Sequence, residues 1–166
     1  IGHGAFYGCA SLTSVTIGDE VTSIGHGAFY GCVSLNIVYI TDIAAWCNIK
    51  FYGYTSNPLF YARSLYLNGE LVTNLVIPDS VTTIGEYAFY TCISLTSVTI
   101  GNGVTNIGYF AFNGCSKLVE VINKSIFDIT KGAWDNSCIG NYALNIKTDG
   151  QSDIVNKNDY LFYTYN

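Results

Sequence analysis

A 23-residue repeat is the feature that most constrains how this chain can fold. Residues 1–9, Ile-Gly-His-Gly-Ala-Phe-Tyr-Gly-Cys, recur unchanged at residues 24–32. Two further copies begin at Ile84 and Ile107, and 16 of the 23 positions of residues 1–23 are identical in residues 84–106. Repeats of this length are typical of solenoids, in which each unit is one turn that buries its apolar face against the next turn.

Apolar residues recur at fixed positions within each unit. In the first unit they are Ile1, Ala5, Phe6, Cys9, Leu12, Val15, Ile17 and Val21. The alternation in Val15-Thr16-Ile17 predicts a strand, whereas the spacing from Ala5 to Cys9 is closer to that of a helical turn. We therefore expect each unit to form a short strand, a turn, a second extended piece and a short helical turn. Stacking these units in parallel, about 4.8 Å apart, places like residues in columns.

The spacing Phe6-x-x-Cys9-x-x-Leu12-x-x-Val15-x-Ile17 resembles the frame of leucine-rich repeats. The 23-residue form with Ile-Gly-x-x-Ala-Phe-x-x-Cys resembles the BspA-like (Treponema-type) class, whose Ile-Pro-x-x-Val joint is matched by residues 77–81. This resemblance implies a right-handed leucine-rich-repeat solenoid that is mostly β with little helix. Its short parallel strands would form the concave side, and extended pieces and short helical turns the convex side. Glu20 stands where the usual repeat keeps an Asn, so we expect no buried Asn ladder.

The repeat also predicts the domain organisation. We expect a single solenoid over residues 1–166, with roughly seven coils and a length of about 35 Å at the strand spacing. Regular units would cover residues 1–23, 24–46, 84–106 and 107–129, an enlarged irregular unit residues 47–83, and an irregular truncated tail residues 130–166. No polar cap is visible at either end, which favours a fragment of a longer protein.

Three local signals lie in the irregular parts. Asp42 is a plausible N-cap of a short helix that begins at Ile43. Asn68-Gly69, between apolar pairs, predicts a β-hairpin that projects from one coil or enlarges its edge. Residues 159–166 are typical of a strand.

The charge pattern excludes several classes of function. Charged residues make up 11% of the chain, the net charge is −5, and the seven Lys and Arg residues are scattered. Binding of nucleic acid or of an anionic membrane surface needs clustered basic residues. No apolar run approaches the roughly 20 residues of a membrane-spanning helix. We therefore expect no nucleic-acid partner and no membrane insertion within this chain.

Cysteine and histidine columns are the main candidates for chemistry. Cys9, Cys32, Cys92 and Cys115 share one repeat position, so a disulfide between Cys9 and Cys32 is within reach in principle. The simpler interpretation is that these cysteines are small buried apolar residues that replace the Leu of related repeats. His3 and His26 also share a position, which holds Glu86 and Tyr109 in later units and is therefore better explained as variable surface.

Catalytic and metal sites are poorly supported by these columns. The sequence contains no Cys-x-x-Cys pair and offers no third metal ligand beside His3 and His26. Residues repeated along a solenoid form ladders, whereas catalysis needs a nucleophile and a base that converge in one pocket. We expect no metal, no cofactor and no enzymatic activity.

Two surfaces are candidates for binding. Outward positions of the strands form the first, and the proposed contact residues are Thr16, Ile37, Tyr39, Val76, Thr99 and Ile122. The second is the aromatic loop of residues 51–61, with Tyr52, Tyr54, Phe60 and Tyr61. Exposed Tyr is typical of contact surfaces because it buries a large area at low entropic cost. The alternatives are an ordinary β-face without a partner, and loop rings that merely plug the enlarged coil.

The resemblance to the BspA-like class implies a function, by analogy of fold alone. It suggests a secreted or bacterial cell-surface protein in which this non-catalytic module binds protein, such as a host extracellular-matrix or surface protein, or a glycan. A passive spacer that holds another domain away from the cell surface is the alternative. An enzyme is the more distant one.

Overall fold

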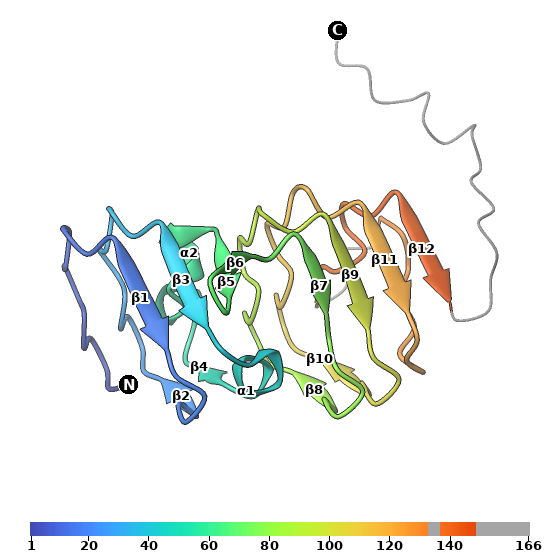
Figure 1. Cartoon of the computed structure of the whole chain (residues 1–166), viewed down its shortest axis with the longest axis horizontal. Coiled ribbons are helices and arrows are strands. Elements are labelled where there is room, and N and C mark those ends of the chain that lie inside the picture. Colours follow the sequence, from blue (N-terminus) through green and yellow to red (C-terminus); the bar gives the residue numbers. More distant parts are fainter. Residues whose placement is uncertain (133–136, 149–166) are drawn as a thin grey trace, which may run out of the picture.

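The computed structural model describes residues 1–132 and 137–148, which form an elongated stack of parallel coils (Figure 1). One side of the stack carries β1 (Ser14–Ile17), β3 (Ile37–Ile40), β5 (Leu65–Leu67), β6 (Glu70–Leu71), β7 (Asn74–Val76), β9 (Ser97–Ile100), β11 (Glu120–Asn123) and β12 (Asn145–Thr148). A second side carries β2 (Ser23–Ile24) paired with β4 (Lys50–Phe51), and β8 (Thr83–Ile84) paired with β10 (Asn106–Ile107). The predicted leucine-rich-repeat solenoid is confirmed.

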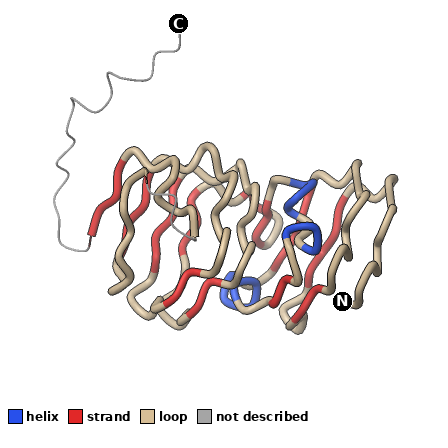
Figure 2. The backbone as a smooth tube through the Cα atoms, turned by 180° about the vertical axis from the view of Figure 1, so that it is seen from behind, coloured by secondary structure: helices blue, strands red, loops and turns tan. Residues whose placement is uncertain are grey.

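Among residues 1–132 and 137–148 helix is scarce and lies only between β3 and β5, as Figure 2 shows from behind. It consists of α1 (Ile43–Cys47), the 3₁₀ helix η1 (Tyr54–Ser56) and α2 (Leu59–Ala62). Asp42 caps α1 as predicted, because its carboxylate accepts a hydrogen bond of 2.8 Å from the Ala45 amide.

The strand pairing follows the repeat. Ser14 lies opposite Ile37, Asn74 opposite Ser97, and Ser97 opposite Glu120, each pair 23 residues apart. The two irregular coils are longer, since Val38 pairs with Leu65 after 27 residues and Glu120 with Asn145 after 25. In the described part of the chain the strands of adjacent coils pair in parallel, as expected when each turn repeats the path of the previous one.

Like side chains stack in columns inside the coils. The rings of Phe6 and Phe29 are 5.0 Å apart, and those of Phe89 and Phe112 are 5.1 Å apart, in both cases stacked. The inward positions of the third regular unit are all fully buried, namely Ile84, Ala88, Phe89, Cys92, Leu95, Val98 and Ile100. Because burying one large apolar side chain contributes about 1.5–3 kcal/mol, such columns supply most of the folding free energy.

Three of the four column cysteines pack as small buried residues, whereas Cys9 in the first coil is exposed. Cys32, Cys92 and Cys115 are fully buried, and Cys9 and Cys32 are free thiols rather than a disulfide. The Cys32 thiol donates to the Phe6 carbonyl oxygen at 3.2 Å, and the Cys115 thiol donates to that of Phe89 at 3.1 Å. Each thiol therefore links its coil to the preceding one.

The hairpin divides the strand side into two sheets. β5 and β6 pair in antiparallel fashion around Asn68 and Gly69, whose φ values of 51° and 88° suit the predicted two-residue turn. The first sheet runs β1-β3-β5-β6 and the second β12-β11-β9-β7. On the second side the stack stays continuous, because the Gly85 amide donates to the Cys47 carbonyl at 2.8 Å.

The described residues make about six turns, where roughly seven coils were expected over the whole chain. The chain passes from β5 to β7 through the hairpin within residues 65–76, without circling the core. This passage adds a strand to the strand side but no complete turn.

The enlarged coil is filled by two polar-tipped side chains. The Trp46 indole N–H donates to the Ala88 carbonyl at 2.9 Å, and the buried Asn57 amide donates to the Tyr87 and Ala88 carbonyls. Asn57 also accepts from the Leu59 amide at 2.8 Å and so holds the start of α2. Among the described residues the buried asparagines are Asn57 and Asn123, which lie in different coils and do not form a ladder.

The end of the tail lies outside the described residues, including the strand predicted for residues 159–166. The part of the tail that is described adds β12 to the second sheet.

Glycines allow the closest approach between coils, which gives a first test. A Cβ built on Gly108 would lie 2.5 Å from the Glu86 amide nitrogen, whereas at the equivalent Gly2 it meets open space. We expect Gly108→Ala to lower the free energy of unfolding by about 1–3 kcal/mol in urea denaturation, because the backbones must separate. Gly2→Ala is the matched control and should change it by less than about 1 kcal/mol. Equal effects of the two substitutions would contradict this packing.

Thiol reactivity gives a second test. Burial raises the pKa of Cys92 to about 11, and it raises that of Cys115 well above its ordinary value. At pH 8 a thiol-specific reagent should therefore label the exposed Cys9 at least a hundredfold faster than Cys92 in the native protein. Since the fold disfavours the thiolate, stability should also fall as the pH rises from about 9 toward 11. Rapid labelling of Cys92 without denaturant would exclude the buried column.

Candidate functional site

The outward strand positions form two rows rather than one surface. Thr16 lies opposite Tyr39 in the first sheet, and Val76, Thr99 and Ile122 follow one another in the second. Ile37 belongs to the neighbouring row, opposite Ser14. Thr16 and Val76 are exposed, and the other four predicted residues are half-buried. The hairpin separates the three residues in the first sheet from the three in the second. Their role in binding stays a prediction.

Tyr66 extends the first of these rows. Its ring lies 5.4 Å from that of Tyr39, its partner in the ladder. The alternation in Leu65-Tyr66-Leu67 was the signal that could have placed Tyr66 on this face. The far end of the second sheet carries instead a half-exposed ion pair between Lys147 and Glu120 at 3.0 Å, which contributes little to stability.

A second surface lies along the turns of the coils that carry the Ala-Phe motif, and we call it the aromatic turn surface. It consists of Tyr7, Tyr30, Tyr54, Phe60, Tyr87, Tyr90, Tyr109 and Phe110. Tyr7 and Tyr30 stack at 5.5 Å in the first two coils. Tyr54 and Phe60 of the enlarged loop then contact Tyr90 at 5.8 and 6.3 Å. Tyr87 continues the row to Tyr109 at 6.3 Å.

Much of the aromatic turn surface is open to solvent. Tyr7 is 66% exposed, and Tyr30, Tyr54 and Tyr109 are each between 44% and 48% exposed. In the repeat, Phe6 turns inward and Tyr7 follows it outward, so each Ala-Phe-Tyr copy contributes one surface ring. Tyr7, Tyr30, Tyr87, Tyr90 and Tyr109 were not among the predicted site residues, although this repeated triplet carried the signal for the first two and for Tyr90.

A groove of about 420 Å³ joins the regular coils to the enlarged loop within this surface. Its lining includes His3, Tyr7, His26, Tyr30 and Tyr54. The two imidazole rings are 6.1 Å apart, in adjacent coils, as their shared repeat position predicted. Among the described residues no three His, Cys, Asp or Glu side chains lie close enough together to hold a metal ion. The groove is lined by ring faces and hydroxyl groups, and its lining contains no Asp, Glu, Lys or Arg.

The structure separates the four residues predicted for the aromatic loop. Tyr54 and Phe60 belong to the aromatic turn surface, with rings 5.4 Å apart. The Tyr61 hydroxyl accepts a hydrogen bond of 3.1 Å from the Gly31 amide and ties the loop to the preceding coil. Tyr52 is exposed beneath the Lys50 ammonium group, which lies 4.7 Å from the ring centroid. The plugging alternative therefore applies in part to Tyr61.

Tyr87 and Tyr90 keep their hydroxyl protons at neutral pH. Partial burial raises the pKa of both phenols, and the neighbouring Glu86 carboxylate adds to the effect at Tyr87. Both hydroxyls can therefore donate hydrogen bonds to a ligand while the rings supply apolar area.

No helix among residues 1–132 and 137–148 is long and apolar enough to cross a bilayer.

Comparison with solved structures finds three leucine-rich-repeat proteins. The Treponema pallidum leucine-rich-repeat protein is 26% identical over 89% of this chain and 65% of its own, with a TM-score of 0.40. A Bacteroides ovatus leucine-rich-repeat protein is 27% identical over 89% of this chain and 40% of its own, with a TM-score of 0.49. A leucine-rich cell surface protein of Faecalibacterium prausnitzii is 24% identical over 76% and 43%, with a TM-score of 0.36. This chain thus spans less than two thirds of each.

Comparison with curated proteins gives no match. The sequence model of the BspA type leucine-rich-repeat region matches in six copies, over residues 1–58 and 62–164. The matched ranges cover the four regular units in full and the enlarged unit except for residues 59–61. The chain belongs to the BspA type leucine-rich-repeat family.

Proposed function

We propose that this chain is a non-catalytic protein-binding module, and that it binds its partner through the aromatic turn surface. The row of exposed and half-buried rings supports this proposal most strongly, since Tyr7 contacts Tyr30, Tyr54 contacts Tyr90, and Tyr87 contacts Tyr109. Contiguous apolar surface rimmed by polar groups is typical of interaction sites. Tyrosine is enriched at the energetic centres of such interfaces.

Two of these rings occupy strained backbone positions, which also supports a binding role. Tyr87 and Phe110 have φ values of 60° and 53°, in the left-handed region that bulky residues disfavour. The equivalent positions of the first two units hold Gly4 and Gly27, with nearly the same φ. An aromatic residue here costs about 1–2 kcal/mol relative to glycine, so folding alone favours glycine. A requirement for rings on this surface accounts for both.

The chemistry of this surface favours a protein partner over a strongly charged ligand. Its groove is lined by aromatic rings, imidazoles and glycine, and the whole chain carries few charges. Binding by such a surface rests on buried apolar area and hydroxyl hydrogen bonds, and therefore depends little on salt. A glycan that stacks on the same rings is the alternative ligand.

We infer the biological setting by analogy with the family. A BspA type repeat suits adhesion by a larger secreted or cell-surface protein, with a host matrix or surface protein as the partner. The alternative function is a passive spacer, for which the continuous ladder of coils is sufficient and the exposed rings are not needed. An enzyme is the more distant alternative, because the described His and Tyr side chains follow the coils instead of converging on one nucleophile.

A binding assay with paired variants tests the proposal. Immobilised extracellular-matrix proteins and a glycan array are probed with the wild-type chain and with the double variant Tyr30→Ser, Tyr54→Ser. We expect wild-type binding to at least one matrix protein and at least a tenfold loss of affinity in the double variant, since central tyrosines often contribute more than 1 kcal/mol each. Raising NaCl from 50 to 500 mM should change the affinity less than about threefold.

Tyr39→Ser is the matched control, because it removes a half-buried tyrosine from the strand side and leaves the turns intact. It should keep wild-type affinity. Loss of binding in Tyr39→Ser alone would move the site to the strand face. Binding of neither proteins nor glycans by any form would favour the spacer, and binding of glycans only would identify the alternative ligand.

A further inference from the structure

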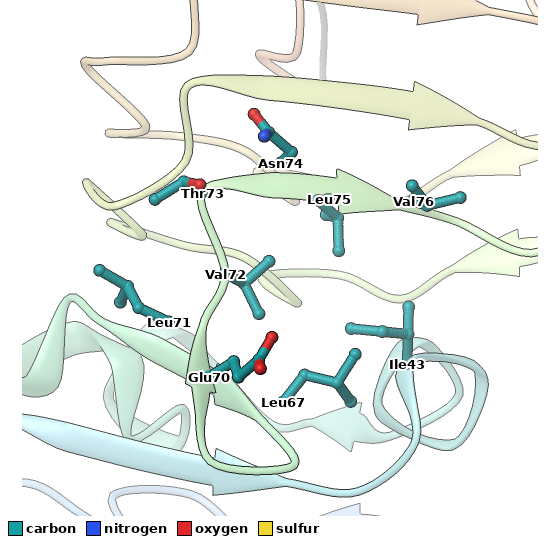
Figure 3. Close-up of a pocket in the computed structure, with 9 residues that line it drawn as sticks. All are labelled: Ile43, Leu67, Glu70, Leu71, Val72, Thr73, Asn74, Leu75 and Val76. Carbon is teal, nitrogen blue, oxygen red and sulfur yellow. The ribbon is translucent and has the colours of Figure 1, made fainter.

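The hairpin leaves an open groove on the strand side, between β6 at the end of the first sheet and β7 at the end of the second. This groove has a volume of about 330 Å³ and is lined by Ile43, Leu67, Glu70, Leu71, Val72, Thr73, Asn74, Leu75 and Val76. Figure 3 shows Leu67 and Ile43 on one side of it and Leu75 and Val76 on the other. The lining is mainly aliphatic, with six aliphatic side chains and a single charged one, Glu70.

β7 is the edge strand of the second sheet and borders this groove. The Thr73 carbonyl accepts from the Ser97 amide at 3.2 Å, and the Ile77 amide donates to the Thr99 carbonyl at 2.9 Å. Backbone groups of alternate residues in a strand point to the same side, so residues 73, 75 and 77 face β9. The N–H and C=O groups of Asn74 and Val76 therefore point toward the groove.

This edge has few of the features that normally protect an exposed strand from pairing. Proteins protect such edges with charged side chains, proline or a covering segment. β7 itself contains Asn74, Leu75 and Val76, and the Val76 side chain is 60% exposed. β6, on the other side of the gap, is only two residues long and pairs with β5.

We propose that this groove binds an extended peptide segment of a partner protein, which adds a strand to the edge of β7. Its backbone would exchange hydrogen bonds with Asn74 and Val76, as in other cases of strand addition. An aliphatic side chain of the peptide would fill the space between Ile43, Leu67 and Val76. The site is separate from the aromatic turn surface and extends the proposed function by a second contact.

Charge complementarity indicates the kind of peptide. Glu70 is exposed, Asp42 directly precedes the lining residue Ile43, and none of the nine lining residues is basic. The chain as a whole carries a net charge of −5. A Lys or Arg next to the aliphatic residue would therefore be favoured over an acidic residue.

A designed peptide tests the site directly. The probe is fluorescein-labelled Lys-Leu-Thr-Ser-Val-Thr-Ile, which places a lysine before the strand sequence of residues 12–17. In a fluorescence-anisotropy titration we expect saturable binding with a Kd below about 1 mM. Replacing the lysine by glutamate should weaken binding at least threefold, and N-methylation of alternate peptide amides should weaken it at least tenfold.

Two variants of Val76 and one matched control locate the binding. Val76→Pro removes an N–H that faces the groove and leaves the bonds to β9 in place, and Val76→Lys adds a cation to the groove. Each should weaken binding at least tenfold. Both variants should keep the far-UV circular dichroism spectrum of the wild-type protein, which shows that they are folded. Thr16→Pro makes the equivalent change on the outer edge of β1, an edge strand of the first sheet, and should change the Kd less than twofold.

Three results would overturn the proposal. They are absence of saturable binding, wild-type binding by both Val76 variants, and loss of binding in Thr16→Pro. The double variant Tyr30→Ser, Tyr54→Ser should bind the peptide normally, so failure of this site and failure of the aromatic turn surface are distinguishable.

Discussion

Stacking of equivalent residues in adjacent coils is the constraint on which the rest of the structure depends. Because the backbone of each turn hydrogen-bonds to the next, a side chain meets the residue 23 positions away, as Phe89 meets Phe112 at 5.1 Å. A residue type that fits its own kind therefore recurs at each inward position. The same contact sets the distance between backbones, which excludes any side chain at Gly108. No single unit could bury its apolar residues alone.

The same constraint determines where binding chemistry can lie. Side chains at inward positions are buried in the columns. Residues that can differ between repeat units therefore lie at the outward strand positions, in the turns and in the irregular coil. On the turns, outward residues of successive coils also meet, as Tyr7 meets Tyr30, and they form part of the aromatic turn surface. On the strand side the ladder is interrupted by the hairpin, which leaves a strand edge exposed. Regular stacking thus produces the extended surface, and its one interruption produces the groove.

Local and periodic signals in the sequence predicted the fold well. The 23-residue shift gave the correct ladder partners, Asn68-Gly69 the hairpin, and Asp42 the helix cap. The described residues make about six turns, against roughly seven coils expected over the whole chain, and the sequence does not show whether the chain circles the core between β5 and β7. The site was harder, since ring contacts such as Tyr54 with Tyr90 join residues 36 positions apart in an irregular coil. Their proximity depends on how the longer loop folds back, which has no periodic signal.

A double-mutant cycle on the phenylalanine column tests the stacking most directly. Phe89→Leu, Phe112→Leu and the double variant are compared by urea denaturation, with Phe29 and Phe112 as the control pair from distant coils. Stacked rings in adjacent coils predict a coupling free energy of about 0.5–1.5 kcal/mol between Phe89 and Phe112, and less than about 0.5 kcal/mol between Phe29 and Phe112. Additive effects at Phe89 and Phe112 would show that these rings are not in contact and would contradict the account.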